Sequence, residues 1–352
     1  MNLHVRSLWS AFNIDPMHTV LELATALICD RVQICVGEAT RRWVAATGRP
    51  AEEFEDACRA FATSARITVN FHPDRLDNRG RTVAQGLRHD GRYVSQWVTG
   101  VSSGSRSAIR GGERERFERD LFGDVYAYAD PHTIEFPIYG ALDNERDPFG
   151  GSPRFGSSYL VLRPGTHRRV TLCMGDSHAG PADVGTFDSP ALVVAGLAEQ
   201  PRRRERSPAR ELDGYIEAQI HGGVDLSTDV EMVVFDPSFL GTSIEDELVA
   251  AGFEYGFAVA CHEGSVLDPV TIDDEFRGSL VRPLALKIAR ADGLIDVRCL
   301  GTYAATLGPA ALPTPDGDTP DSPLQLVKYL WHTLVAYGHP WHPSERESPV
   351  DT

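Results

Sequence analysis

The stretch Tyr215-Ile-Glu-Ala-Gln-Ile-His221 decides the fold, because polar and apolar residues alternate strictly along it. A period of two predicts a β-strand, with side chains pointing alternately to its two faces. The apolar face carries Ile216, Ala218 and Ile220 and is expected to pack on the core. The polar face carries Tyr215, Glu217, Gln219 and His221. We therefore expect a strand that presents hydrogen-bonding side chains to a shared space.

The same alternation marks a strand at residues 67–71, where Ile67, Val69 and Phe71 share one face. Further apolar or alternating runs predict strands at 92–101, 159–163, 170–174 and 231–235. Between them, helical spacing predicts helices at 82–89 and 113–121. Two loops rich in Pro and Gly, at 147–156 and 175–190, interrupt these strands, and loops of this length are often functional.

The two ends of the chain have helical periodicity. Asp15-Pro16 predicts a helix start, Gly37 its end, and further helices are expected before Gly48 and after Pro50. Helices are also expected at 243–251, 276–290 and 323–337. The sequence thus predicts an α+β protein with a helical segment at 1–64, a β-core at 65–240 and a mainly helical segment at 241–352.

Composition and charge narrow the class of protein. The chain has 352 residues, of which 42% are hydrophobic, as in ordinary globular proteins. With 34 basic and 50 acidic residues its net charge is −16, which disfavours nucleic acid and membrane surfaces as partners. Six cysteines without a C-x-x-C pair suggest neither a zinc knuckle nor a disulfide framework. Because no apolar signal segment is found, we expect a cytoplasmic protein.

Two further groups of polar residues are candidates for ligand binding. After the strand at 67–71 come His72 and Arg75, which can bind a hydroxyl and a phosphate or carboxylate, respectively. The run at 92–102 includes Ser95, Thr99 and Ser102, small residues that let a ligand approach the backbone. The alternative for both groups is a solvated strand face with no ligand.

A metal site is the main alternative chemistry. Asp176 and His178 follow a predicted strand and, with His72, Asp74 and His221, supply several hard-metal ligands. A binuclear metallophosphoesterase would use such a set, but its G-N-H and G-H-x-H motifs are missing. The chain also has no phosphate loop, nucleophile elbow or dinucleotide fingerprint.

Four ordered motifs carry a family resemblance, and together they extend over about residues 64 to 300. They are Ile67-Thr-Val-Asn-Phe-His-Pro-Asp-Arg75, the run from Gly91 to Ser102, the run from Ser152 to Pro164, and Tyr215-Ile-Glu-Ala-Gln-Ile-His-Gly222. With them the chain resembles the family called domain of unknown function 3626. The order of these parts also looks like that of toxin-type ADP-ribosyltransferases.

The second resemblance implies a split antiparallel β-core and NAD as substrate. It implies that His72 or Arg75 contacts NAD, that Ser95 or Thr99 shapes the pocket, and that Glu217 binds the nicotinamide ribose. The implied catalytic residues are Glu217, Gln219 and His221. The implied cofactor-binding residues are His72, Arg75, Ser95, Gln96, Thr99, Ser102, Arg154 and Tyr159, and no metal ligand is implied.

The chemistry expected of this site is cleavage of the bond between nicotinamide and ribose. That step develops oxocarbenium character, so a carboxylate from Glu217 held against the ribose would stabilise the transition state. ADP-ribose would then pass to an acceptor that the sequence does not identify. Where arginine-modifying members carry Glu-x-Glu, this strand has Glu217-Ala-Gln219. A metal-dependent phosphoesterase and a non-catalytic nucleotide-binding module are the alternative functions.

Overall fold

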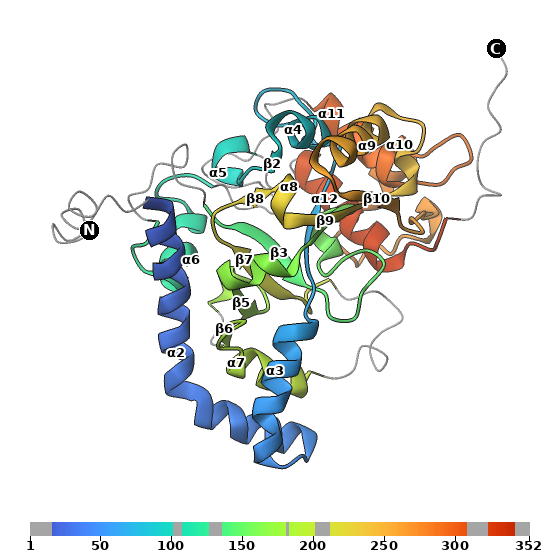
Figure 1. Ribbon diagram of the computed structural model, residues 1–352. Helices are drawn as coiled ribbons and strands as arrows, with labels where there is room; N and C mark the ends of the chain where they lie inside the picture. The colour runs from blue at the N-terminus through green and yellow to red at the C-terminus, as the bar shows by residue number, and fades with distance from the viewer. Residues whose placement is uncertain are drawn as a thin grey trace.

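A computed structural model describes residues 16–100, 108–126, 136–180, 183–200, 212–307 and 323–341. It is an α+β structure built on one eight-stranded sheet (Figure 1). In spatial order the strands are β10 (Ala258–Cys261), β9 (Val230–Phe235), β4 (Ser158–Leu162), β1 (Ile67–Phe71), β3 (Ile138–Leu142), β7 (Ile216–Ile220), β5 (Val170–Met174) and β6 (Val184–Thr186). Within this sheet β9 and β10 pair in parallel, and the other neighbours are antiparallel. A small second sheet pairs β2 (Arg92–Tyr93) with β8 (Val224–Asp225).

The strand register aligns side chains from distant parts of the chain. Ala141 of β3 lies opposite Thr68 on one side and Glu217 on the other, and Glu217 lies opposite Cys173 of β5. Residues that lie directly opposite one another point to the same face of a sheet. The polar side chains of β1 and β7 therefore share one face, as the alternation predicted.

Helices surround the sheet at both ends. Their bounds are α2 (Pro16–Thr47), α3 (Phe54–Ser64), α4 (Val83–Asp90), α5 (Gln96–Thr99), α6 (Glu113–Phe122), α7 (Ala191–Glu199), α8 (Leu226–Asp229), α9 (Ser243–Tyr255), α10 (Val281–Ile288), α11 (Val297–Thr306) and α12 (Pro323–Tyr337). The long α2 packs on α7, β5 and β6, whereas α9 packs on α4 and β10 and the last three helices pack together (Figure 1). The main buried apolar cluster includes residues from Ala24 in α2 to Val335 in α12, and Tyr159, Val161 and Val234 form a second, smaller one. No helix in these described ranges combines the length and apolarity needed to cross a membrane.

Several predictions from the sequence are confirmed. The strands predicted near 67, 159, 170, 215 and 231 are β1, β4, β5, β7 and β9, and α4, α6, α9 and α12 lie where helices were predicted. The helix predicted at 276–290 is confined to α10. At the start of α4, the Thr82 hydroxyl accepts a hydrogen bond from the backbone of Gln85, whose side chain accepts one in return. This capping box explains why the helix begins there.

Other predictions were wrong. The strand expected at 92–101 ends at Tyr93, because Ser95 takes the N-cap position of α5 and Gly100 ends that helix with a φ of 67°. The two helices expected before Gly48 are one continuous α2, since Gly37 is tolerated within it. The strands β3, β6, β8 and β10 were not predicted. The observed class is α+β, with a mixed eight-stranded sheet and a small two-stranded sheet, and the expected split antiparallel core is not confirmed.

Candidate active site

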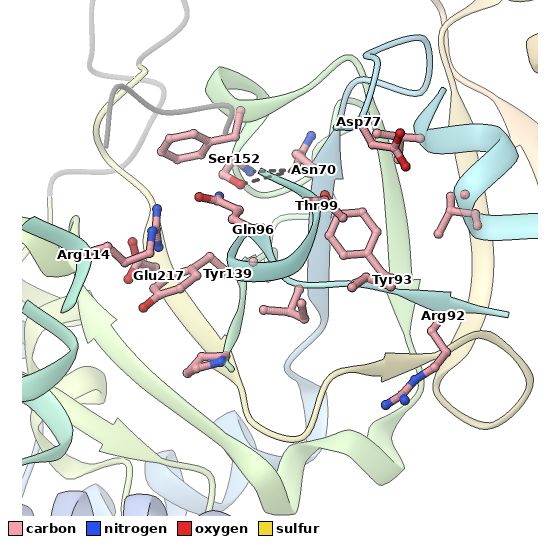
Figure 2. A pocket seen from close by; sticks show the side chains of 18 of the residues that line it. Asn70, Asp77, Arg92, Tyr93, Gln96, Thr99, Arg114, Tyr139, Ser152 and Glu217 are labelled. Carbon is pink, nitrogen blue, oxygen red and sulfur yellow. Dashed lines mark hydrogen bonds between the residues drawn. The ribbon is translucent and has the colours of Figure 1, made fainter. Parts of the chain in front are cut away.

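A large cavity lies over the polar face of the sheet. It encloses about 1,410 Å³, including the part open to solvent. Its walls come from β1, the segment from Asp77 to Thr99, α6, β3, the turn at Ser152–Phe155, the turn after β5, β7 and α12. Figure 2 shows Arg114, Glu217 and Tyr139 together at one end of the cavity and Arg92 and Tyr93 at the other. The cavity thus joins segments that are far apart in the sequence.

Glu217 is a buried carboxyl group on the wall of this cavity. Its side chain is 6% exposed and accepts a hydrogen bond from Gln219 Nε2 at 2.8 Å. Burial raises its pKa from 4.5 to about 7, helped by the charge of Asp176 and opposed by Ser177, Gln219 and Arg114. Among the described residues no cation forms an ion pair with it. Such a group can change between the neutral and ionised forms near neutral pH.

Arg114 of α6 lies beside Glu217 and Tyr139 at this end of the cavity, as Figure 2 shows. It is 7% exposed, and its guanidinium lies 4.6 Å from the centre of the Tyr139 ring and 5.2 Å from that of Phe117. No carboxylate of the described chain lies within ion-pair distance of it. A buried guanidinium stacked on aromatic rings and open to a cavity can bind an anionic group of a ligand.

Gln219 and His221 do not line the cavity. They are 1% and 0% exposed, and both contact the hydroxyl of Thr171 on the neighbouring strand, at 2.8 and 3.0 Å. The other ring nitrogen of His221 lies 2.6 Å from the Tyr126 hydroxyl. Burial, with the charge of Arg169, lowers the pKa of His221 to about 3, so this imidazole is neutral at physiological pH. Of the three predicted catalytic residues, only Glu217 reaches the cavity.

The turn that forms the upper wall is held by β1. Asn70 donates hydrogen bonds to the carbonyls of Phe149 and Gly156 and accepts one from the backbone of Ser152, as Figure 2 shows for the last pair. Gly156 lies so close to β1 that a side chain there would overlap the backbone of Phe71. The polar residues of β1 therefore position this wall, and Asn70 also lines the cavity.

His72 and Arg75 do not share the cavity with Glu217, so this geometric prediction was wrong. The chain turns away at the end of β1, and His72 packs edge-on against Trp331 of α12 with 4.9 Å between ring centres. Burial lowers the pKa of His72 to about 3. The indole of Trp331 in turn donates hydrogen bonds to the carbonyls of Pro153 and Arg154. His72 therefore supports the wall from outside.

The remaining predicted cofactor-binding residues divide into two groups. Gln96, Thr99 and Arg154 line the cavity. Ser95 is buried without lining it, Tyr159 packs with Val161 and Val234, and Ser102 lies outside the described residues. Arg154 also forms an ion pair with the exposed Asp213.

Sequence reasoning missed several residues of the cavity wall. Arg114 was hidden in a charged helix, and Tyr139 lies on the unpredicted β3. Lys328 is contributed by α12, more than a hundred residues after Glu217. The apolar spacing of α6, with Phe117, Leu121 and Phe122 buried, is a signal that one face of that helix packs on the sheet.

The residues proposed as metal ligands are not brought together. Asp176 and His178 line the cavity, whereas His72 faces α12 and Asp74 lies against Gly301 of α11. His221 is buried below the cavity beside Tyr126. Within the described part of the chain no three potential ligands gather around one point. The described residues therefore do not form the set of metal ligands that the phosphoesterase alternative requires.

Comparison with known proteins gives the family. The model of the family described as "Protein of unknown function (DUF3626)" matches residues 66–204 and 199–337. The chain belongs to this family. It is also similar to the Gene 2 protein of Mycobacterium phage L5, with 31% identity over 182 residues, and to the Gene 2 protein of Mycobacterium phage D29, with 28% over 180. Each match covers 46% of this chain and 65% of the relative, so the chain spans less than two thirds of these relatives. Neither name states an activity.

Proposed function

We propose that the chain is an NAD-dependent enzyme resembling ADP-ribosyltransferases, which cleaves the bond between nicotinamide and ribose and transfers ADP-ribose to an acceptor. The observation that carries the proposal is the buried carboxyl group of Glu217, which lines a large cavity and has no ion-pair partner among the described residues. A desolvated carboxylate interacts strongly with positive charge. Positive charge develops on the ribose when this bond breaks.

The cavity wall also suits the rest of the substrate. It carries five Lys or Arg and four Asp or Glu residues, although acidic residues outnumber basic ones by 50 to 34 in the whole chain. Arg81 is paired with Asp77 and Asp90, and Arg154 with Asp213, whereas the buried Arg114 has no carboxylate within ion-pair distance in the described part of the chain and favours an anionic ligand such as a pyrophosphate. Tyr93, Phe117, Tyr139 and Phe155 add aromatic surface for planar rings.

The chemistry assigned to the chain's own residues is limited. The Glu217 carboxylate would lie against the ribose and stabilise charge that appears only in the transition state. Arg114 and Arg154 would bind the phosphates. Nicotinamide leaves as a neutral molecule, so no general acid is required. The identity of the acceptor stays open.

Release of nicotinamide from NAD tests the proposal. Wild-type protein should release it, and Glu217→Gln should slow the release by about 10²–10³-fold, which is the usual effect of removing one group that stabilises transition-state charge. Asp236→Asn is the matched control, because Asp236 is also a buried acid with its pKa raised to about 7 but does not line the cavity. Equal rates for wild type and Glu217→Gln would contradict the proposal.

Calorimetry separates the enzyme from a binding module. Tight binding of NAD without release of nicotinamide would favour the non-catalytic alternative. If NAD is neither bound nor cleaved, NAD is not the ligand.

A further inference from the structure

The hydrogen bonds behind Glu217 have a direction that their chemistry determines. An ionised carboxylate only accepts hydrogen bonds, so the contact at 2.8 Å must be donated by the amide NH₂ of Gln219. The amide oxygen of Gln219 then faces Thr171, whose hydroxyl donates its one proton to it at 2.8 Å. With that proton used, the Thr171 oxygen can only accept from His221 at 3.0 Å.

This assignment fixes the tautomer of His221. The neutral ring has one N–H, which must be on Nε2 because Nε2 faces Thr171. Nδ1 is then an acceptor, and the Tyr126 hydroxyl at 2.6 Å donates to it. Every proton from Tyr126 to Gln219 thus points toward Glu217.

We propose that Tyr126, His221, Thr171 and Gln219 form a one-directional hydrogen-bond chain that positions the Glu217 carboxylate. This hydrogen-bond chain holds Oε1 as an acceptor while the carboxyl group lines the cavity. These four are positioning residues: they are 0% to 3% exposed, none lines the cavity, and they act through Glu217. Their effect on turnover rests on the proposed function, whereas the existence of the hydrogen-bond chain does not.

Such a chain offsets part of the penalty of burying a charge. Hydrogen bonds aligned head to tail polarise one another, and bonds to an ionised group are stronger than neutral ones. The other groups around Glu217 are Arg114 of α6, Asp176 and Ser177 after β5, and Cys173 of β5. Cys173 Sγ lies 3.9 Å from Oε1, farther than Gln219 Nε2 at 2.8 Å, and Ser177 lowers the pKa of the carboxyl group together with Gln219. Tyr139 of β3 and Tyr215 also interact electrostatically with this carboxyl group.

The first test is the tautomer of His221 in the wild-type protein, read by nitrogen NMR of histidine-labelled full chain. We expect the Nε2–H form at pH 8 to 9, where the Glu217 carboxyl group is ionised. His262 provides an internal reference, because its Nδ1 accepts from Gly264 and its Nε2 faces the carbonyl of Ser157, which also requires Nε2–H. An Nδ1–H tautomer at His221 would overturn the proposal without any substitution.

The second test uses two substitutions of Thr171 with opposite chemistry. Thr171→Val keeps the shape and removes the hydroxyl, whereas Thr171→Ser keeps the hydroxyl and removes a methyl group. If the hydrogen-bond chain positions Glu217, Thr171→Val should raise the titration midpoint of the Glu217 carboxyl group by about 0.5–1 pH unit. Carbon NMR measures this midpoint. Ser should leave that midpoint near the wild-type value. The His262 signal should stay unchanged in both variants and so report an intact fold.

A purely structural role predicts that Thr171→Ser, which loses packing, shifts the midpoint more than Thr171→Val does. An unchanged midpoint in Thr171→Val, or an equal shift in Thr171→Ser, would refute the hydrogen-bond chain. Neither measurement needs turnover. If the NMR results hold and the protein releases no nicotinamide, the chain stands and the proposed function fails. If nicotinamide is released but the two variants have the same midpoint, the proposed function stands and the hydrogen-bond chain is refuted.

Discussion

Replacing Glu217 by Gln should stabilise the folded chain at alkaline pH. Burial raises the pKa of this carboxyl from 4.5 to about 7 in the folded state. Below pH 4.5 both the folded and the unfolded chain hold the proton, so the group has no effect on stability. As the pH rises the unfolded chain loses its proton first, which favours unfolding until the folded carboxyl is also ionised above pH 7.

The size of the effect follows from the difference between the two pKa values. A difference of about 2.5 pH units corresponds to about 3 kcal/mol in the free energy of unfolding at pH 8, and to less than about 1 kcal/mol at pH 5. Gln has nearly the same shape as Glu and can still accept the hydrogen bond from Gln219. The variant should therefore gain most of this free energy without a compensating loss.

Urea unfolding at pH 5 and pH 8 measures the gain. Glu231→Gln is the control, because Glu231 is also on a strand, β9, but is exposed. The control should change stability by no more than about 0.5 kcal/mol at either pH. The reasoning would be refuted if Glu217→Gln were no more stable than wild type at pH 8, or if its gain were the same at both pH values.

Three further predictions concern the wall and the pH response of the cavity. Gly156→Ala should lower the free energy of unfolding in urea by more than about 2 kcal/mol, because its Cβ would overlap the backbone of β1. Gly165→Ala, with open space around it, should be nearly neutral. Equal effects of the two substitutions would contradict this account. Arg114→Gln should weaken the binding of inorganic pyrophosphate, measured by calorimetry, whereas Arg116→Gln removes the same charge from the exposed side of α6 and should leave it unchanged; two equal losses would show a non-specific charge effect. Nicotinamide release should rise as the pH increases through about 7, since the ionised form of Glu217 is the active one, and a rate that falls over this range would oppose that role.

The local parts of the fold were predictable from the sequence. Alternation identified β1 and β7 and assigned Glu217 to the polar face correctly, because a strand with one apolar face fixes its own orientation. It failed for β3, where Gly140 interrupts the pattern although the strand is as long as β1 and β7. Gly140 is there because β3 lies between β1 and β7, and a side chain at this position would overlap the carbonyl of Thr68. That reason is tertiary, so no local pattern records it.

The composition of the cavity was less predictable for a similar reason. Alternation predicts where a side chain points but not what lies above it. Gln219 and His221 point the same way as Glu217, yet α6 and the residues after it cover His221 with Phe122 and Tyr126. His72 continues the polar face of β1 by sequence but leaves the sheet where the strand ends.

Burial alone does not single out Glu217. Glu118 and Asp236 are also buried acids and Asp74 is a half-buried one, and burial raises the pKa values of all three to about 7. Of these four groups, Glu217 is the one that lines the cavity. Desolvation of a carboxyl group lowers stability wherever it occurs, but it can contribute to chemistry only where a ligand can reach the group. The combination of a raised pKa, a directed set of hydrogen-bond donors behind the carboxyl and open space in front of it is therefore the argument for Glu217 as the reactive group.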